Sequence, residues 1–422
     1  MEEKLMITET AHSKLKPKVT FVLLYIAYII CFIDRSAMNI ALAYIGKDFH
    51  LSTTTLGVVS SAFFFSYALM QIPGGWLTDK FGTKPTIIFA ISIWSIFTIL
   101  TGFAWSLASL LVIRVLFGIG EGAFPSASLK QISESVDYSH RAKATSGIIS
   151  SNYIGSAIAP LLIAPIMVNF GWQTTFHLMG VIGVIFVIVY YFNLRHVTYQ
   201  QQQLSHQRRH INWSSVIHNR LIWQFFIVVF GLSIVTKGLD SWMPTYLLQA
   251  RHINLAGIAW LVPLPALAAG CGAILSGFVM NRFFVNREKW LIVVTSLLAT
   301  GFMYGMYQST SLAAVIIFEI ATYFFKSIAF SSSFALFAML MDKDSYGSSV
   351  GIVNFGGQLA GFVAPLLIGY LVDQFNGSYS AAFLVLVMAA AVSFVAAITF
   401  NSKHLNANKQ AASQEAPVNE DY

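Results

Sequence analysis

The chain places eight ionisable side chains inside segments that are otherwise apolar. They are Asp34, Arg35, Arg114, Glu121, Lys237, Asp240, Glu319 and Lys326, and their formal charges sum to zero. By insertion scales, a charged residue at the centre of a membrane-spanning helix costs about 2.5 to 3.5 kcal/mol. Such residues persist where they pair with one another or face a water-filled cavity, so this set is the first candidate for a functional site.

The composition indicates that the segments around these charges cross a membrane. Of 422 residues, 56% are hydrophobic and 10% are charged, whereas an ordinary soluble domain has roughly 25% charged residues. Apolar stretches of about 20 residues, the length that crosses the hydrocarbon core, recur along the chain. We expect twelve, at 19–44, 55–77, 86–104, 107–129, 143–168, 173–194, 219–248, 256–281, 289–308, 311–340, 346–372 and 379–400.

Basic residues are concentrated on one side of these segments. The two tails and the even-numbered connections hold most of the Lys and Arg residues, whereas the odd-numbered connections hold only Lys47 and Arg251. Because basic loops stay in the cytoplasm, we expect a multi-pass protein of the bacterial inner membrane with both termini cytoplasmic. The net charge of +7 comes largely from these loops, so it predicts no nucleic-acid partner.

The two halves of the chain resemble each other. Residues from 147, "GIISSNYIGSAIAPLLIAPIMVNFGW", echo residues from 351, "GIVNFGGQLAGFVAPLLIGYLVDQFNG", with Pro160 and Pro365 at an offset of 205. We therefore expect an all-α membrane protein with twelve transmembrane helices in two pseudo-symmetric six-helix bundles, a secondary-transporter architecture whose substrate site lies between the halves. The expected parts are an N-tail at 1–18, a bundle at 19–194, a cytoplasmic linker at 195–218, a second bundle at 219–400 and a C-tail at 401–422.

The intramembrane charges follow this repeat. Three charged positions correspond between the halves: Arg114 with Glu319 and Glu121 with Lys326 at an offset of 205, and Arg35 with Lys237 at an offset of 202. The positions are kept, while the signs of the first two pairs are exchanged. Since ionisable groups within membrane helices normally face a bundle interior or water, we infer that these helices line one shared cavity.

Heights along the helices suggest how the charges of the first half pair. At about 1.5 Å per residue from the cytoplasmic side, Asp34 lies about 22 Å up its helix and Arg114 lies at a similar height. We expect an Asp34–Arg114 pair, which leaves Arg35 free to face an anion and Glu121 without a fixed cation. A desolvated carboxylate without a steady partner can take up a proton near neutral pH, so Glu121 is the candidate proton carrier.

Purely structural ion pairs are the alternative for this set, because its charges sum to zero. For Glu319 and Lys326 the sequence leaves a structural pair, a gate and a substrate contact open. Asp240, late in its segment and next to Trp242, is expected at a mouth or interface rather than at the midplane. Cys31 and Cys271 lie in apolar segments without metal-ligand spacing, so no metal site is expected.

Uncharged polar residues inside the segments are further candidates. Tyr67, Asn152 and Gln358 could donate or accept hydrogen bonds from the hydroxyl groups of a solute. Asn152 and Gln358 lie within one position of equivalence in the repeat, so we place them above other polar residues. The alternative for each is a hydrogen bond between helices.

The connection after the second segment reads "GGWLTDKFGTKPT". It places Gly75 and Asp79 at the cytoplasmic surface with Lys80 and Lys84 nearby. A carboxylate there can bind a basic neighbour or a helix N-terminus in one conformation and release it in another. We expect a conformational latch, with a plain tight turn as the alternative.

These motifs resemble a known family. "GGWLTDKFGTK" and the two sets of six segments are similar to the major facilitator superfamily. Within it, "DRSAMNIAL", "RVLFGIGEGAFPSAS", "SWMPTYL" and "GSSVGIVNFGGQLAGFVAP" resemble the anion:cation symporter family, which includes bacterial carriers of galactonate, glucarate and hexuronates and animal sialic-acid and vesicular glutamate transporters. The resemblance covers about residues 20 to 400.

The resemblance implies roles for individual residues. Arg35 and Arg114 would recognise the carboxylate of the substrate, and Asp34 and Glu121 would be the protonation and coupling pair. Tyr67 and Asn152 match polar pocket positions, although Asn152 is more often Gln in the family. Lys237 is similar to a basic residue that the glutamate-type members carry in the seventh segment.

Taken together, the residues and the resemblance predict a proton-coupled secondary transporter that imports an organic anion, a sugar acid or another carboxylate, by alternating access. H⁺ is the expected coupling ion and Na⁺ the alternative. The competing functions are an exporter of organic anions or drugs with the same fold and, as a different class, a non-transporting nutrient sensor. No nucleophile, metal or phosphate-binding motif indicates an enzyme or a cofactor, and the expected partners are the small-molecule anion and the lipid bilayer around a monomer.

Overall fold

The computed structural model describes residues 17–136, 138–193, 217–341 and 346–400. The expected C-tail and almost all of the expected N-tail and linker lie outside these residues, and Pro17 and Lys18 of the expected N-tail belong to the first helix. The first half contains α1 (Pro17–Asp48), α2 (Thr53–Phe81), α3 (Thr83–Gly102), α4 (Leu107–Gly122), α5 (Phe124–Ser135) and α6 (Tyr138–Asn193). The second half contains α8 (Arg220–Thr245), the π-helical η1 (Tyr246–Ala250), α9 (Leu255–Leu261), α10 (Pro263–Phe283), α11 (Glu288–Gln308), α12 (Leu312–Leu340), α13 (Tyr346–Gln374) and α14 (Ser380–Ile398).

These helices confirm the twelve expected membrane crossings. Eleven helical ranges of the described chain are long and apolar enough to cross a membrane, and one of them, Ser150–Asn193, has 44 residues. That range is interrupted at Gly171, whose φ of 79° and ψ of 166° lie in a region that is essentially restricted to glycine. The fifth and sixth crossings therefore meet at Gly171. Helices α4 and α5 together form the fourth crossing, with Pro125 in the first turn of α5.

Polar side chains fix where several helices begin. Ser52 accepts a hydrogen bond from the backbone N–H of Thr55 at the start of α2, and Asn254 accepts one from Gly257 at the start of α9. At the start of α4, Ser106 and Ser109 form a reciprocal capping box. Such caps satisfy backbone donors that the helix itself leaves unpaired.

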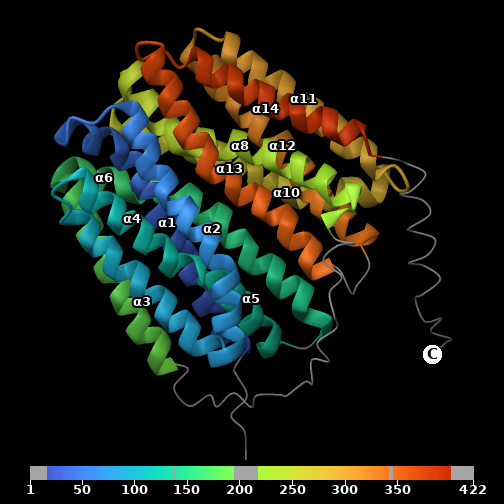
Figure 1. Ribbon diagram of the computed structural model, residues 1–422, viewed down its shortest axis with the longest axis horizontal. Helices are drawn as coiled ribbons and strands as arrows, with labels where there is room; N and C mark the ends of the chain where they lie inside the picture. Colours follow the sequence, from blue (N-terminus) through green and yellow to red (C-terminus); the bar gives the residue numbers. More distant parts are fainter. Residues whose placement is uncertain (1–16, 137, 194–216, 342–345, 401–422) are drawn as a thin grey trace, which may run out of the picture.

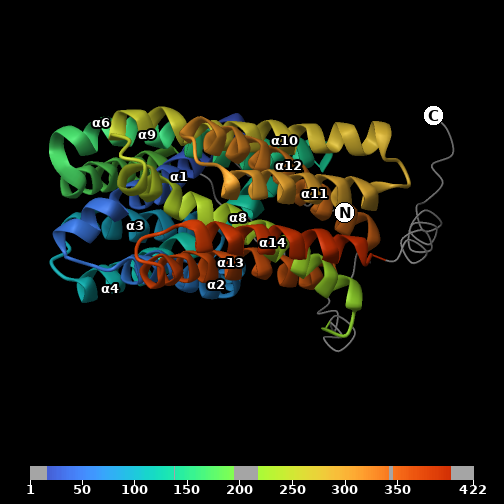
Figure 2. The ribbon, with the colours of Figure 1, turned by 90° about the horizontal axis from the view of Figure 1, so that it is seen from above.

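The helices form two bundles, one from α1–α6 and one from α8–α14, which lie side by side in Figure 1. In Figure 2 the helices of both bundles run along a common direction. We call the face at which α1 begins and α14 ends the tail face, and the face at which α1 ends and α2 begins the far face. Each crossing reverses direction, so α13 ends at the far face.

Within the first bundle, glycines of α4 allow close contact with α2. A Cβ atom at Gly118 would lie 2.6 Å from the carbonyl oxygen of Phe63, and one at Gly122 would lie 2.7 Å from that of Tyr67. Both distances are shorter than real Cβ contacts. The close approach holds Glu121, between these glycines, against α1 and α2.

The two bundles meet along α2 and α13, along α6 and α10, and along α1 and α8. The α2–α13 contact is closed at the far face. A Cβ atom at Gly57 would lie 2.5 Å from the carbonyl oxygen of Pro365. The carboxylate of Asp373, near the end of α13, accepts hydrogen bonds from the backbone N–H groups of Thr53 (3.0 Å) and Thr54 (2.7 Å). A carboxylate of one bundle thus caps a helix of the other.

Candidate functional site

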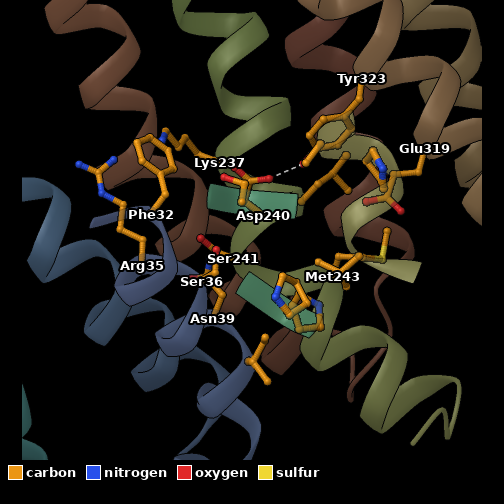
Figure 3. Close-up of a pocket in the computed structure, with 18 of the residues that line it drawn as sticks. Phe32, Arg35, Ser36, Asn39, Lys237, Asp240, Ser241, Met243, Glu319 and Tyr323 are labelled. Atoms are coloured by element: carbon orange, nitrogen blue, oxygen red, sulfur yellow. Dashed lines mark hydrogen bonds between the residues drawn. The ribbon is translucent and has the colours of Figure 1, made fainter. Parts of the chain in front are cut away.

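A cavity of about 80 Å³ lies between the two bundles. Its charged lining consists of Arg35 from α1, Lys237 and Asp240 from α8, and Glu319 from α12. Figure 3 shows Arg35 and Lys237 on one side of this cavity, Asp240 near its centre, and Glu319 on the opposite side. Helices α1, α8 and α12 share this cavity as predicted, whereas Arg114 and Glu121 of α4 and Lys326 of α12 do not line it.

Tyr323, a polar residue that the sequence places inside the tenth apolar segment, lines the cavity. The cavity also has uncharged polar groups that the sequence reasoning missed, namely Ser36, Asn39, Ser156 and Ser241. One signal was available: Asn39 lies four residues after Arg35 and therefore on the same face of α1. These hydroxyl and amide groups can bind the hydroxyl groups of a solute.

The strongest contact beside the cavity is an ion pair between Arg35 and Glu121. Glu121 also accepts a hydrogen bond from the thiol of Cys31 at 2.9 Å. The guanidinium of Arg35 lies over the ring of Tyr67, 4.6 Å from its centroid, and 5.2 Å from that of Phe63. Cation–π contacts of this kind add to the ion pair in holding Arg35.

This ion pair corrects two expectations from the sequence. Arg35 is not free, and Glu121 does have a fixed cation. The expected Asp34–Arg114 pair is also wrong, since no nitrogen–oxygen contact within 4.0 Å joins these two residues, although both are described. Arg114 instead donates to the hydroxyl of Thr101 at 2.8 Å, and its guanidinium lies 4.6 Å from the centroid of the Phe117 ring.

Asp34 and Arg114 are nevertheless both buried, each 2% exposed. Asp34 accepts a long hydrogen bond, 3.4 Å, from Thr98. Arg114 and Arg35 together line a second cavity of about 30 Å³, and Asn39 lines both cavities. The two arginines predicted to bind an anion are thus near one another, with only Arg35 at the central cavity.

The second bundle carries its own polar cluster. Asp240 accepts a hydrogen bond from the hydroxyl of Tyr323 at 2.6 Å, and Lys326 donates to the hydroxyl of Thr236 at 2.6 Å. Asp240 is exposed and lines the cavity between the bundles, which agrees with the expected mouth or interface position. Glu319 and Lys326 do not form an ion pair with each other in the described chain.

The uncharged polar candidates lie outside the lining of the central cavity. Tyr67 is 5% exposed and contacts Arg35 through its ring. The side-chain oxygens of Asn152 and Gln358 are buried and have no hydrogen-bond partner within the described part of the chain. Their roles in substrate binding remain predictions.

At the tail face, Asp79 forms an ion pair with Lys130 at 2.7 Å. The expected basic neighbours have other contacts: the ammonium of Lys80 lies 4.6 Å from a ring centroid of Trp76. A Cβ atom at Gly75 would meet nothing within 4 Å, so packing does not require glycine there. Asp79 and Lys130 belong to the same bundle, so the contact does not join the two halves.

A cavity lined by charges from two pseudo-symmetric six-helix bundles defines a membrane transporter that binds its solute between the halves. A model of the Major Facilitator Superfamily matches residues 24–324 and 252–420. The chain belongs to this superfamily, which consists of transporters rather than enzymes, and the resemblance predicted from its motifs is confirmed.

Several similar proteins are named as carriers of sugar acids. The "Hexuronate transporter" of Bacillus subtilis (strain 168) is 27% identical over 91% of this chain and 95% of its own length. A "D-galactonate transporter" of Escherichia coli O6:H1 is 27% identical over 90% of this chain and 94% of its own length. The "Probable galactarate/D-glucarate transporter GarP" of Escherichia coli (strain K12) is 26% identical over 92% and 96%.

A solved structure has the same fold. It is an inward-facing, unoccupied bacterial homolog of the human lysosomal transporter Spinster, which superimposes with a TM-score of 0.80 at 19% identity and covers 94% of this chain and 99% of that one. The likeness confirms the all-α fold of two bundles.

Proposed function

We propose that the protein is a proton-coupled secondary transporter that imports an organic anion, of the sugar-acid class, across the bacterial inner membrane. The observation that carries the proposal is the ion pair between Arg35 and Glu121 at the edge of a cavity between the bundles. Arginine is the residue best suited to bind a carboxylate in a bidentate manner. Here its partner is a carboxylate of the protein itself.

In the proposed cycle, Glu121 and the cargo compete for Arg35. When Glu121 is protonated it no longer neutralises the guanidinium, so Arg35 can bind the carboxylate of the cargo. When Glu121 releases its proton it binds Arg35 again and displaces the cargo. Cargo and proton therefore travel together, which is the requirement for symport.

Other charged residues would assist this exchange. Lys237 lines the cavity on the same side as Arg35 and offers a second cation to the cargo. Arg114 and Asp34, both buried close to the Arg35 site, would tune its electrostatics, and Asn152, Tyr67 and Gln358 stay candidates for contacts made in other conformations.

We further propose that the tail face is cytoplasmic and that this conformation faces inward. The basic residues of the loops support the orientation. The closed α2–α13 contact, with Asp373 capping α2 at the far face, supports an outer gate that is shut. Asp79 and Lys130 would act as a latch within the first bundle. A monomer suffices, because both halves of the cavity come from one chain.

Proteoliposomes with an imposed proton gradient test the coupling. We expect uptake of D-galactonate, a hexuronate or galactarate that rises with an acidic exterior and that a sodium gradient does not replace. Glu121→Gln should abolish net uptake while exchange of labelled for unlabelled cargo continues. The matched control is Glu134→Gln, which removes a carboxylate of α5 that lies outside both cavities and accepts from Thr83.

Uptake that ignores the pH gradient, or net uptake by Glu121→Gln at the rate of the control, would refute proton coupling through this residue. If an inward proton gradient instead drove solute out of the vesicles, the protein would be an exporter.

A further inference from the structure

The charges around the central cavity are divided by sign. Arg35 and Lys237 lie on one side, and Asp240 and Glu319 extend from the centre to the other side (Figure 3). A site for a simple anion needs only the cationic side. The acidic side calls for its own physical explanation.

Glu319 has no partner that would explain its presence. It is 3% exposed, it lines the cavity, and within the described chain no hydrogen bond or ion pair reaches its carboxylate. An ionisable group inside a membrane protein is normally paired or in water, and the carboxylate of Asp240 lines the same cavity. Two charged carboxylates that face one cavity are stabilised by an opposite charge between them.

The lysines of the second bundle do not supply that cation. Lys326 donates to Thr236, and the ammonium of Lys237 lies 4.8 Å from the centroid of the Phe64 ring. Neither forms an ion pair with Asp240 or Glu319 within the described part of the chain. Asp240 receives a hydrogen bond from the hydroxyl of Tyr323, a donor that favours the charged carboxylate.

The charge balance favours a cargo that carries a positive group. In the proposed cycle the cargo takes the place of Glu121 on Arg35, so the lining then holds two cations, Arg35 and Lys237, and two carboxylates, Asp240 and Glu319. A monoanion would bind the cations and leave the two carboxylates without a partner. A molecule with an ammonium and a carboxylate adds no net charge, and each of its charges would meet an opposite one.

We propose that the cargo is zwitterionic, an amino-sugar acid whose carboxylate binds at Arg35 and Lys237 and whose ammonium binds between Asp240 and Glu319. Lys237 and Asp240 are three residues apart on α8, so their Cβ atoms are about 5 to 6 Å apart on one face. That spacing suits an ammonium and a carboxylate on neighbouring atoms. Ser36, Asn39 and Ser241 supply partners for hydroxyl groups. The inference rests on the proposed function, since it specifies the cargo of the same site.

A matched pair of ligands tests the inference on the purified full-length transporter. D-Gluconate and 2-amino-2-deoxy-D-gluconate differ only in a hydroxyl group that is replaced by an ammonium. We expect the amino compound to bind about ten- to a hundredfold more tightly by isothermal titration calorimetry, the range for one hydrogen bond to a charged group. In Glu319→Gln this preference should shrink to about threefold or less, while binding of D-gluconate is unchanged or tighter.

A second substitution and a control keep the result interpretable. Asp240→Asn should lower the preference in the same way if Glu319→Gln does not yield folded protein. Asp48→Asn removes a carboxylate at the end of α1 that accepts from Trp172, away from the cavity, and should keep the full preference.

The outcomes separate the two proposals. If D-gluconate binds as tightly as its amino derivative, or if both acidic substitutions leave the preference intact, the zwitterion inference is refuted and the organic-anion function stands. An additional proton on Asp240 and Glu319 would then account for the acidic side. If neither ligand binds, nor any of the sugar acids offered to the proteoliposomes, both proposals fall together.

Discussion

If Glu121 and the cargo compete for Arg35, as we propose, the affinity for an acidic cargo should depend on pH. A cargo that meets the charged carboxylate of Glu121 must displace it from Arg35. A proton on Glu121 makes Arg35 available, so the affinity for the cargo should rise as the pH falls. Glu121→Gln removes the competing charge, and its affinity should be high and independent of pH.

The size of the effect follows from the burial of the pair. The side chain of Glu121 is 1% exposed and that of Arg35 is 14% exposed, so solvent screens the pair far less than a surface ion pair, whose contribution is about 0–1 kcal/mol. A hydrogen bond to a charged group contributes about 1.5 to 3 kcal/mol. The cargo therefore loses about ten- to a hundredfold in affinity when Glu121 competes.

The measurement is calorimetric titration of the purified transporter with the tightest-binding sugar acid at pH 5.5 and pH 8. Wild type should bind at least about tenfold more weakly at pH 8, and Glu121→Gln should bind equally at both values. Glu134→Gln, outside the site, should show the same difference in affinity between the two pH values as wild type. If Glu121→Gln bound more weakly than wild type at pH 8, or kept the wild-type difference between the two pH values, Glu121 would not be the competitor of the cargo.

Three further predictions concern the gate, the core and the latch. Asp373→Asn should weaken the cap on α2 and open the far face, which faster labelling of Ser61→Cys by a membrane-impermeant maleimide would reveal; an unchanged rate would contradict it. Trp94 is fully buried in the first bundle, and Trp94→Ala should lower the free energy of unfolding by about 3 to 5 kcal/mol, seen as a lower melting temperature in detergent. Lys130→Ala should lower the free energy of unfolding, measured in the same way, by less than about 1 kcal/mol, because the side chain of Asp79 is 74% exposed. A larger loss would mean that the pair stabilises the fold.

The membrane fold could be predicted because it depends on properties that the sequence displays directly. The length of an apolar segment sets a crossing, and the repeat sets two bundles. The pairing of charges could not be predicted in the same way. Residues 34 and 35 differ by only about 1.5 Å in height but by about 100° in direction around α1. A count of heights therefore could not decide whether Asp34 or Arg35 faces α4.

Asp240 lines the same cavity as Arg35 although it lies late in its helix. Asp240 lies about 30 Å from the start of α8, and Arg35 lies about 27 Å from the start of α1, given the observed bounds of these helices. The two residues are therefore at similar depth, as their shared cavity requires.

The exchange of signs between the halves explains why one side of the central cavity is cationic and the other side is acidic. In the first bundle Glu121 can pair with Arg35. The corresponding positions in the second bundle are Lys326 and Lys237, two cations that cannot pair, so Lys326 turns to the hydroxyl of Thr236.

The same exchange places a carboxylate, Glu319, where the first bundle has Arg114. Arg114 is satisfied by Thr101, whereas Glu319 faces the cavity without a partner in the described chain. One half of the repeat thus holds two of its charges in a closed pair, which a proton on Glu121 would open in the proposed cycle. The other half lines the cavity with a lysine and two carboxylates, and the cargo that would match both halves has a carboxylate at one end and a cation close to it.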